Sequence, residues 1–168
     1  ALFDQVRDAR MPGTKYIDLV RKHIVGESDQ DILTTTLRYA SGVISNYIPS
    51  QFYEKYSSDM FSLVMKLLSA DNLSDVTIIT LLRYVIEFSS TDEHREILMK
   101  WLSEGPFSLS GEKKTSIKSK LLSQEMRFNI VQFIHSSKKI GNDIKEKLLK
   151  EEVTRDNNSK QSVMASHS

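Results

Sequence analysis

Apolar side chains recur at every third or fourth position along most of the 168-residue chain, which is the spacing of one face of an α-helix. The most regular stripe advances by alternating steps of four and three residues and consists of Leu33, Leu37, Ala40, Ile44 and Tyr47. Ser28 or Asp29 can cap this helix at its start. Pro49 ends it, because the residue before a proline avoids helical geometry. The pattern predicts one amphipathic helix between these signals.

Breaking and capping residues divide the rest of the chain into similar segments. There are only 6 glycines and 3 prolines, so long periodic segments predominate and an all-α fold is expected. Thr14 and Ser74 are expected to cap two of the helices. The chain should contain about eight helices, separated at Pro12-Gly13, Gly26, Pro49, "SADNLSD", "SSTDE", a loop at about 104–120, and "KKIG".

One segment, Val76–Phe88, is apolar on nearly all sides except at Thr77, Thr80, Arg83 and Glu87. A helix that is apolar around most of its circumference is usually packed between neighbours. We therefore expect this helix at the centre of the fold.

Both ends of the chain have helical spacing. Leu2, Phe3 and Val6 keep the period with no capping residue before them. Near the other end a helix capped by Asn142 or Asp143 is followed by the polar "TRDNNSKQ", and "SVMASHS" is compatible with the start of another helix. We expect a single helical domain over 1–168, truncated at both ends.

Short turns between amphipathic helices predict antiparallel neighbours. Two architectures fit this pattern: a compact bundle, or helix pairs stacked into a right-handed superhelix. The chain shows no strict internal repeat of the kind that marks a regular solenoid.

Composition excludes several classes of function. Lys plus Arg is 23 and Asp plus Glu is 22, so the formal net charge of +1 gives no electrostatic reason to expect nucleic acid or an anionic membrane as partner. The longest apolar stretch, "VTIITLLRYVIEF", is too short to span a bilayer and contains an arginine. Without cysteine there is no disulfide, thiolate metal site or cysteine nucleophile. This composition fits a reducing compartment, and we expect a cytoplasmic location.

Catalytic and metal-binding motifs are missing from the sequence. The four histidines form no H-E-x-x-H motif, no serine lies in G-x-S-x-G, and the glycines form no phosphate-binding loop. We expect His94 in a solvated first helical turn and His23 and His135 at exposed or boundary positions. No catalytic residue, metal ligand or cofactor is assigned to this chain.

Three arginines, Arg38, Arg83 and Arg127, lie within helical segments rich in apolar residues. A buried arginine is costly unless it is paired or lines a wet cavity. One interpretation is that each extends to the surface or pairs with a nearby carboxylate such as Glu87. The other is that they line a concave surface and contact an anionic ligand such as a peptide carboxylate.

Two parts of the chain resemble the C-terminal helical domain of zinc aminopeptidases of the aminopeptidase N type. The first is "ALFDQVRDARMPGTKYIDLVRKHIVGESDQDILTTTLRYA", with its "VRD" turn, its "YIDLV" helix and its "ESD" cap before a long helix. The second is "LLSQEMRFNIVQFI" followed by "IKEKLLKEEVTRDNNSKQ", where an aromatic residue follows an arginine and a polar "RD" turn closes a helix. The order and spacing of these stretches carry the resemblance.

The resemblance implies about eight antiparallel helices in an α-superhelical (HEAT/armadillo-like) array that covers the active site of a zinc enzyme and limits or positions peptide substrates. The zinc ligands and catalytic glutamate of that family lie outside these residues, so this chain alone should be inactive. The implied partners are the catalytic domain of the same polypeptide and peptide substrates. Arg38, Arg83 and Arg127 are the candidate contacts for the peptide carboxylate.

An alternative interpretation is a non-enzymatic α-solenoid scaffold that binds a protein partner on an exposed face. A four-helix-bundle metal carrier fits poorly, because the chain lacks Glu-x-x-His on two helices.

Overall fold

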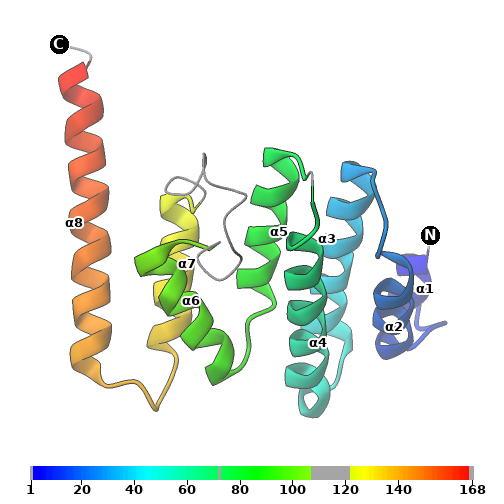
Figure 1. The fold of residues 1–168 in the computed structure, drawn as a ribbon. Helices are drawn as coiled ribbons and strands as arrows, with labels where there is room; N and C mark the ends of the chain where they lie inside the picture. The colour runs from blue at the N-terminus through cyan, green and yellow to red at the C-terminus, as the bar shows by residue number, and fades with distance from the viewer. Residues whose placement is uncertain (1, 72, 107–121, 167–168) are drawn as a thin grey trace. The chain divides into compact units, whose positions relative to one another are not determined.

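The structure is a computed structural model, and it describes residues 2–71, 73–106 and 122–166, with side chains described as far as residue 157 (Figure 1). In this part of the chain there are eight α-helices and no strand. The all-α prediction is therefore confirmed. Most of the expected loop at about 104–120 lies outside the described residues.

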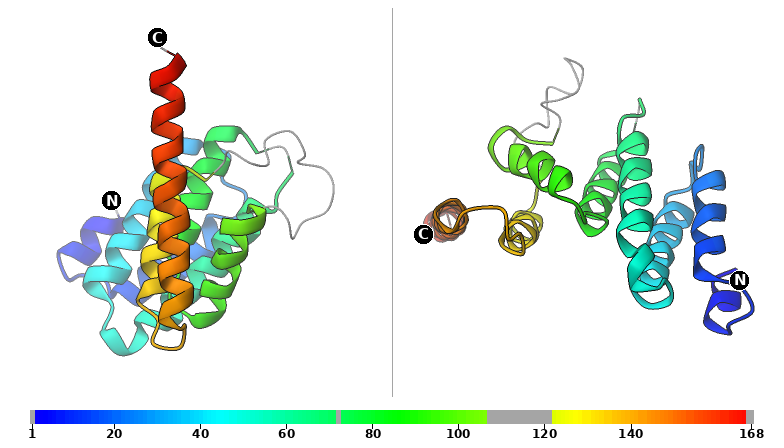
Figure 2. Two further views of the ribbon diagram at one scale, coloured as in Figure 1. Left: turned by 90° about the vertical axis from the view of Figure 1, so that its left-hand side faces the viewer. Right: turned by 90° about the horizontal axis from the view of Figure 1, so that it is seen from below.

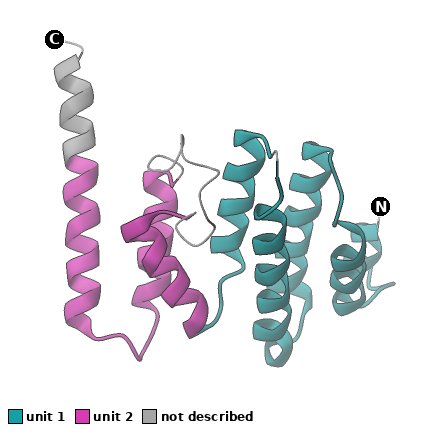
Figure 3. Cartoon of the chain, viewed as in Figure 1, with its two compact units in different colours: residues 1–91 teal, residues 92–168 magenta. Residues whose placement is uncertain are grey.

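The chain divides into two compact units, residues 1–91 and residues 92–168 (Figure 3). The first unit contains α1 (Leu2–Arg7), α2 (Gly13–His23), α3 (Gln30–Tyr47), α4 (Ser50–Leu68) and α5 (Asp75–Glu87). The second contains α6 (Asp92–Glu104), α7 (Gln124–His135) and α8 (Asn142–Ser166).

In the first unit, helices α2 to α5 form two layers (Figure 2). Helix α2 contacts α4 in one layer, and α3 contacts α5 in the other. Contacts between α2 and α3 and between α4 and α5 join the layers. Consecutive helices thus pair across the layers. As a result, α3 lies beside α5, although the whole of α4 separates them in the sequence.

Local sequence explains the ends of these helices. The side chain of Asp29 accepts hydrogen bonds from the backbone N–H groups of Asp31 and Ile32, and that of Ser74 accepts one from Thr77. Both caps agree with the sequence prediction. The expected cap at Thr14 is wrong, because α2 already begins at Gly13 with Pro12 at the N-cap position.

Gly13 lets α2 approach α3 closely. A Cβ atom at this position would lie 3.0 Å from Cγ1 of Val43 and 3.1 Å from the carbonyl oxygen of Tyr47. Both neighbours belong to α3, and the backbone carbonyl has little freedom to move away. A larger residue at Gly13 would therefore push the two helices apart.

The prediction that Val76–Phe88 is buried on nearly all sides holds for only part of α5. Leu81, Leu82 and Val85 are fully buried, whereas Val76 is 57% exposed and Ile79 is 39% exposed. The helix contacts α3 and α4 of its own unit. At the other end, the hydroxyl of buried Ser57 on α4 donates to the carbonyl oxygen of Phe88 at 2.9 Å.

In the second unit, α7 contacts both α6 and α8. Leu98 and Trp101 from α6 and Ile130 and Ile134 from α7 are fully buried. Helix α8 spans 25 residues and runs through "TRDNNSKQ", so the break suggested by that polar stretch is absent. None of its residues is glycine or proline, and polar residues on an exposed helix do not end it. No helix in the described residues combines the length and apolarity needed to cross a membrane.

We predict that Leu82→Ala lowers the free energy of unfolding by about 2–5 kcal/mol, because it leaves a cavity at a fully buried position. Val76→Ala is the matched control in the same helix and should change the unfolding free energy by less than about 1 kcal/mol, since its side chain is mostly exposed. Urea unfolding followed by circular dichroism measures both. Equal stability losses in the two variants would contradict the burial pattern of α5.

Candidate functional site

Two of the three candidate arginines line one pocket. Arg38 on α3 and Arg83 on α5 border a cavity of about 230 Å³ together with Ser41, Tyr84 and Glu87. Both guanidinium-bearing side chains are exposed. The contact between α3 and α5 brings together residues that are 45 positions apart in the sequence.

The helical period explains why these arginines emerge at the pocket. Arg38 follows the buried Leu37, and Arg83 follows the buried Leu82. The next residue on a helix is turned by about 100° from its predecessor, so each arginine leaves the core at its margin. The buried stripes of α3 and α5 therefore direct both cations to the boundary between these helices.

Polar contacts hold the wall of the pocket. The hydroxyl of Ser41 donates to Oε1 of Glu87 at 2.9 Å, which links α3 to α5. The Tyr84 hydroxyl lies 3.5 Å from the carbonyl oxygen of Thr34, and the guanidinium of Arg38 lies 5.2 Å from the centre of the Tyr39 ring. Burial raises the pKa of Tyr84, while the charge of Arg38 opposes that shift. Tyr84 is therefore a neutral phenol near pH 7.

The pocket has a net positive charge, because two guanidinium groups face one carboxylate. Glu87 already accepts the hydrogen bond from Ser41. Among the described residues, neither Arg38 nor Arg83 forms an ion pair. Such a pair of guanidinium groups can bind a carboxylate or phosphate through charge-assisted hydrogen bonds.

Arg127 lies in the second unit and has a different environment. Its Nε donates to Oε2 of Glu152 on α8 at 2.7 Å, and its Nη2 donates to the other carboxylate oxygen and to the carbonyl oxygen of Leu102 at 2.9 Å. Both side chains are buried. Burial alone would raise the pKa of Glu152, but the hydrogen bonds and charge of Arg127 outweigh burial and lower it. Contact between Arg127 and a peptide carboxylate stays a prediction. The ion pair disfavours that contact, because the guanidinium is already bound to the Glu152 carboxylate.

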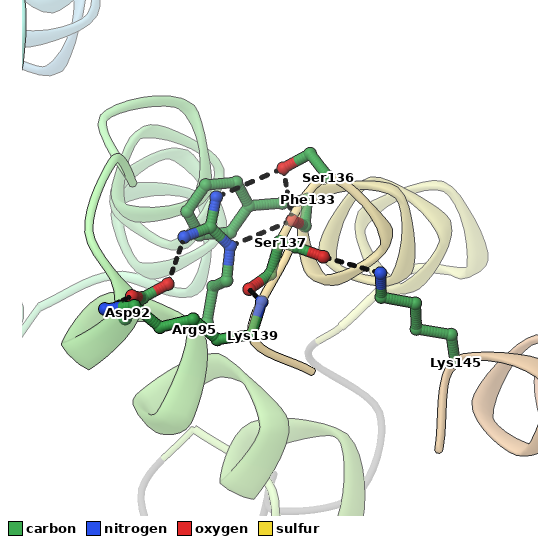
Figure 4. A network of polar contacts seen from close by, with 7 residues as sticks. All are labelled: Asp92, Arg95, Phe133, Ser136, Ser137, Lys139 and Lys145. Atoms are coloured by element: carbon green, nitrogen blue, oxygen red, sulfur yellow. Dashed lines mark hydrogen bonds and ion pairs between the residues drawn. The ribbon is translucent and has the colours of Figure 1, made fainter. Parts of the chain in front are cut away.

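A second arginine of this unit, Arg95, was missed by the sequence analysis. Figure 4 shows its side chain among polar partners from α6 and the end of α7. Its guanidinium lies 4.3 Å from the centre of the Phe133 ring and donates to the carbonyl oxygen of the same residue at 3.1 Å. It also donates to Asp92 at 2.7 Å and to the hydroxyl of Ser136 at 3.1 Å. These contacts tie the start of α6 to the end of α7. The spacing of three residues from Asp92 to Arg95 was the available sequence signal.

Lys139 extends this network by pairing with the Asp92 carboxylate. The hydrogen bond from Lys139, and after it Arg95, lowers the pKa of Asp92, and the same contact raises the pKa of Lys139. The network is therefore charged near neutral pH, and each nitrogen of the Arg95 guanidinium donates to a partner within the unit. These contacts give the network a role in joining α6 to α7.

His94 was expected in a solvated turn, and that expectation is wrong. It is buried on α6, where it shares a face with Leu98 and Trp101 at spacings of four and seven residues. Burial lowers its pKa, so the ring is neutral near pH 7. His23 is exposed and His135 is half-buried, as expected, with Nε2 of His135 2.9 Å from the carbonyl oxygen of Lys145. No group of three His, Cys, Asp or Glu residues that could hold a metal ion occurs in the described part of the chain.

A larger cavity in the first unit is apolar. It has a volume of about 760 Å³ and lies among α1, α2 and α3. Phe3 and Tyr39 stack in its wall with ring centres 4.4 Å apart, and Tyr16 contacts Phe3 edge-on. Burial raises the pKa of Tyr16 to about 12, so this part of the wall is uncharged. The sequence analysis did not anticipate this groove.

Comparison of the chain with protein-family models, curated proteins and solved structures found no match.

We predict that Glu152→Gln lowers the free energy of unfolding by about 3–5 kcal/mol near pH 7, because it leaves the Arg127 charge buried without its partner. The folded-state pKa of Glu152 is below its ordinary value, so its contribution is present above the ordinary pKa and is lost as the pH falls through the folded pKa. Acidification should therefore destabilise the wild-type chain more than the variant.

Glu151→Gln is the matched control, since its side chain is exposed and lies 3.9 Å from Lys147 in a weak surface pair. It should cost less than about 1 kcal/mol. Urea unfolding at pH 7 and at lower pH measures both variants. Equal losses for the two glutamates, or equal acid sensitivity of wild type and Glu152→Gln, would contradict a structural role for the buried pair.

Proposed function

We propose that this chain acts as the C-terminal helical domain of a zinc aminopeptidase of the aminopeptidase N type, where it covers the active site and limits or positions peptide substrates. The sequence resemblance suggests the family. The observation that carries the role is the pocket in which Arg38 and Arg83 lie on adjacent helices without carboxylate partners among the described residues.

This pocket suits the carboxyl terminus of a peptide. A carboxylate accepts hydrogen bonds from guanidinium groups with matching geometry, and hydrogen bonds to charged groups are worth about 1.5–3 kcal/mol each. The pocket volume of about 230 Å³ can hold a terminal carboxylate with part of the last residue, but not a whole peptide. Contact with only the distal end would make binding depend on peptide length.

In this proposal, the catalytic domain of the same polypeptide would supply the zinc chemistry that cleaves the peptide bond, and the helical domain contributes binding and coverage. The helices would belong to an α-superhelical (HEAT/armadillo-like) array. Support for that arrangement comes from the first unit, where α2 and α4 form one layer and α3 and α5 the other. A cytoplasmic location is part of the same proposal.

The test measures binding of an N-terminally fluorescein-labelled nonapeptide, as the free acid and as the C-terminal amide, by fluorescence anisotropy. We predict that the free acid binds at least about tenfold more tightly than the amide, since one charge-assisted interaction exceeds 1.4 kcal/mol. Arg83→Gln should remove this difference. Arg10→Gln, which alters an exposed arginine of the same unit outside the pocket, should retain it.

Equal binding of acid and amide by the wild-type chain would contradict the proposed carboxylate contact. An equal effect of Arg10→Gln and Arg83→Gln would show that only overall charge matters. Hydrolysis of aminoacyl chromogenic substrates by the purified chain alone would contradict the assignment of catalysis to another domain.

The alternative function is a non-enzymatic α-solenoid scaffold. The observation that favours it is the apolar groove among α1, α2 and α3, which a protein partner could fill. The two proposals differ in the peptide experiment, because a scaffold has no reason to distinguish a terminal carboxylate from an amide.

A further inference from the structure

The apolar groove of the first unit has the dimensions of a helix-binding site. Its wall includes residues from Tyr16 to Ile24 along α2 and from Asp31 to Tyr39 along α3. At 1.5 Å per residue, each stretch is about 12 Å long, which corresponds to roughly two helical turns. A groove between two neighbouring helices accepts the side-chain ridge of a third helix.

Exposed apolar residues at the edge of the groove indicate an occupant larger than the cavity. Leu2 is 51% exposed and Ile32 is 52% exposed, and both line the groove. A small molecule within the cavity would leave these two apolar side chains in contact with water. A helix lying over the groove would cover them and insert its own apolar side chains between them.

The charges around the groove specify the polar flank of that helix. Glu27 and Asp31 line the groove, whereas no lysine or arginine does so in the described part of the chain. The carboxylate of Glu27 accepts a hydrogen bond from the backbone N–H of Asp29 at 2.7 Å, which orients it at the start of α3.

We infer that this groove binds an amphipathic α-helix from a protein partner, with large apolar residues at the helical spacing and lysine or arginine beside them facing Glu27 and Asp31. Charge complementarity favours such a partner over α8 of the chain itself. Helix α8 has four cations and five anions among residues 142–157, so it has no net positive charge to complement the two carboxylates. This inference does not depend on the proposed peptidase role, since the arginine pocket has a different lining.

The probe is a fluorescein-labelled Leu/Lys peptide of about 14 residues designed as an amphipathic helix, compared with a Leu/Glu peptide that has the same apolar face. Fluorescence anisotropy at physiological ionic strength should show at least tenfold tighter binding of the Leu/Lys peptide. The double variant Glu27→Gln/Asp31→Asn should remove the preference between the two peptides.

Apolar contact is tested with Ile32→Lys, which should weaken binding of the Leu/Lys peptide at least tenfold. Val76→Lys introduces the same charge at a valine that is similarly exposed but lies outside the groove, and this variant should bind like wild type. Thr35→Lys, also in the groove wall, replaces Ile32→Lys if circular dichroism shows that variant to be unfolded.

Three results would overturn the inference. The first is equal binding of the Leu/Lys and Leu/Glu peptides by the wild-type chain. The second is equal weakening by Val76→Lys and Ile32→Lys, because general repulsion would then explain both. The third is a dimer in sedimentation velocity that Ile32→Lys dissociates, because a second copy of the chain would then be the occupant.

Discussion

Helices α2 to α7 each bury apolar side chains along one face, and that face is removed from water by contact with another helix. Because the turns are short, the nearest available partner is usually a neighbour in the sequence, as for α2 with α3, α4 with α5 and α7 with α8. The contact between α3 and α5 is different, because these helices are not consecutive in the sequence and a local sequence pattern does not predict it. It also brings Arg38 and Arg83 into the lining of one pocket.

Polar side chains add specificity to this apolar packing. Apolar contact alone does not fix how far one helix is shifted along another, and a few hydrogen bonds between helices help to do so. One example is the bond from the Ser57 hydroxyl to the carbonyl oxygen of Phe88. The Arg127–Glu152 pair does the same between α7 and α8 at the cost of burying two charges. The guanidinium of Arg127 is paired with a carboxylate, whereas Arg38 and Arg83 in the first unit line a pocket that has room for a ligand. An arginine with a buried carboxylate partner stabilises the fold, whereas an arginine without one is a candidate for ligand binding.

The sequence predicted the fold class and most helix positions because periodicity and capping are local signals. The stripe from Leu33 to Ile44 and the caps at Asp29 and Ser74 are examples. Continuity of α8 was not predicted, since a polar stretch is equally typical of a turn and of an exposed helix. The burial of His94, the partner of Arg127 and the apolar groove depend on which helices meet in space, and no pattern within one segment contains that information.

Packing of α3 against α5 builds the arginine pocket, and a double-cysteine variant can test this packing. The chain has no cysteine, so Ser41→Cys/Glu87→Cys introduces a unique pair at positions whose native side chains are hydrogen-bonded at 2.9 Å. A short bis-maleimide cross-linker and mass spectrometry of the digested monomer measure the linkage. We expect efficient intramolecular cross-linking in buffer and little in concentrated guanidinium chloride. Equally poor cross-linking in both conditions would contradict it.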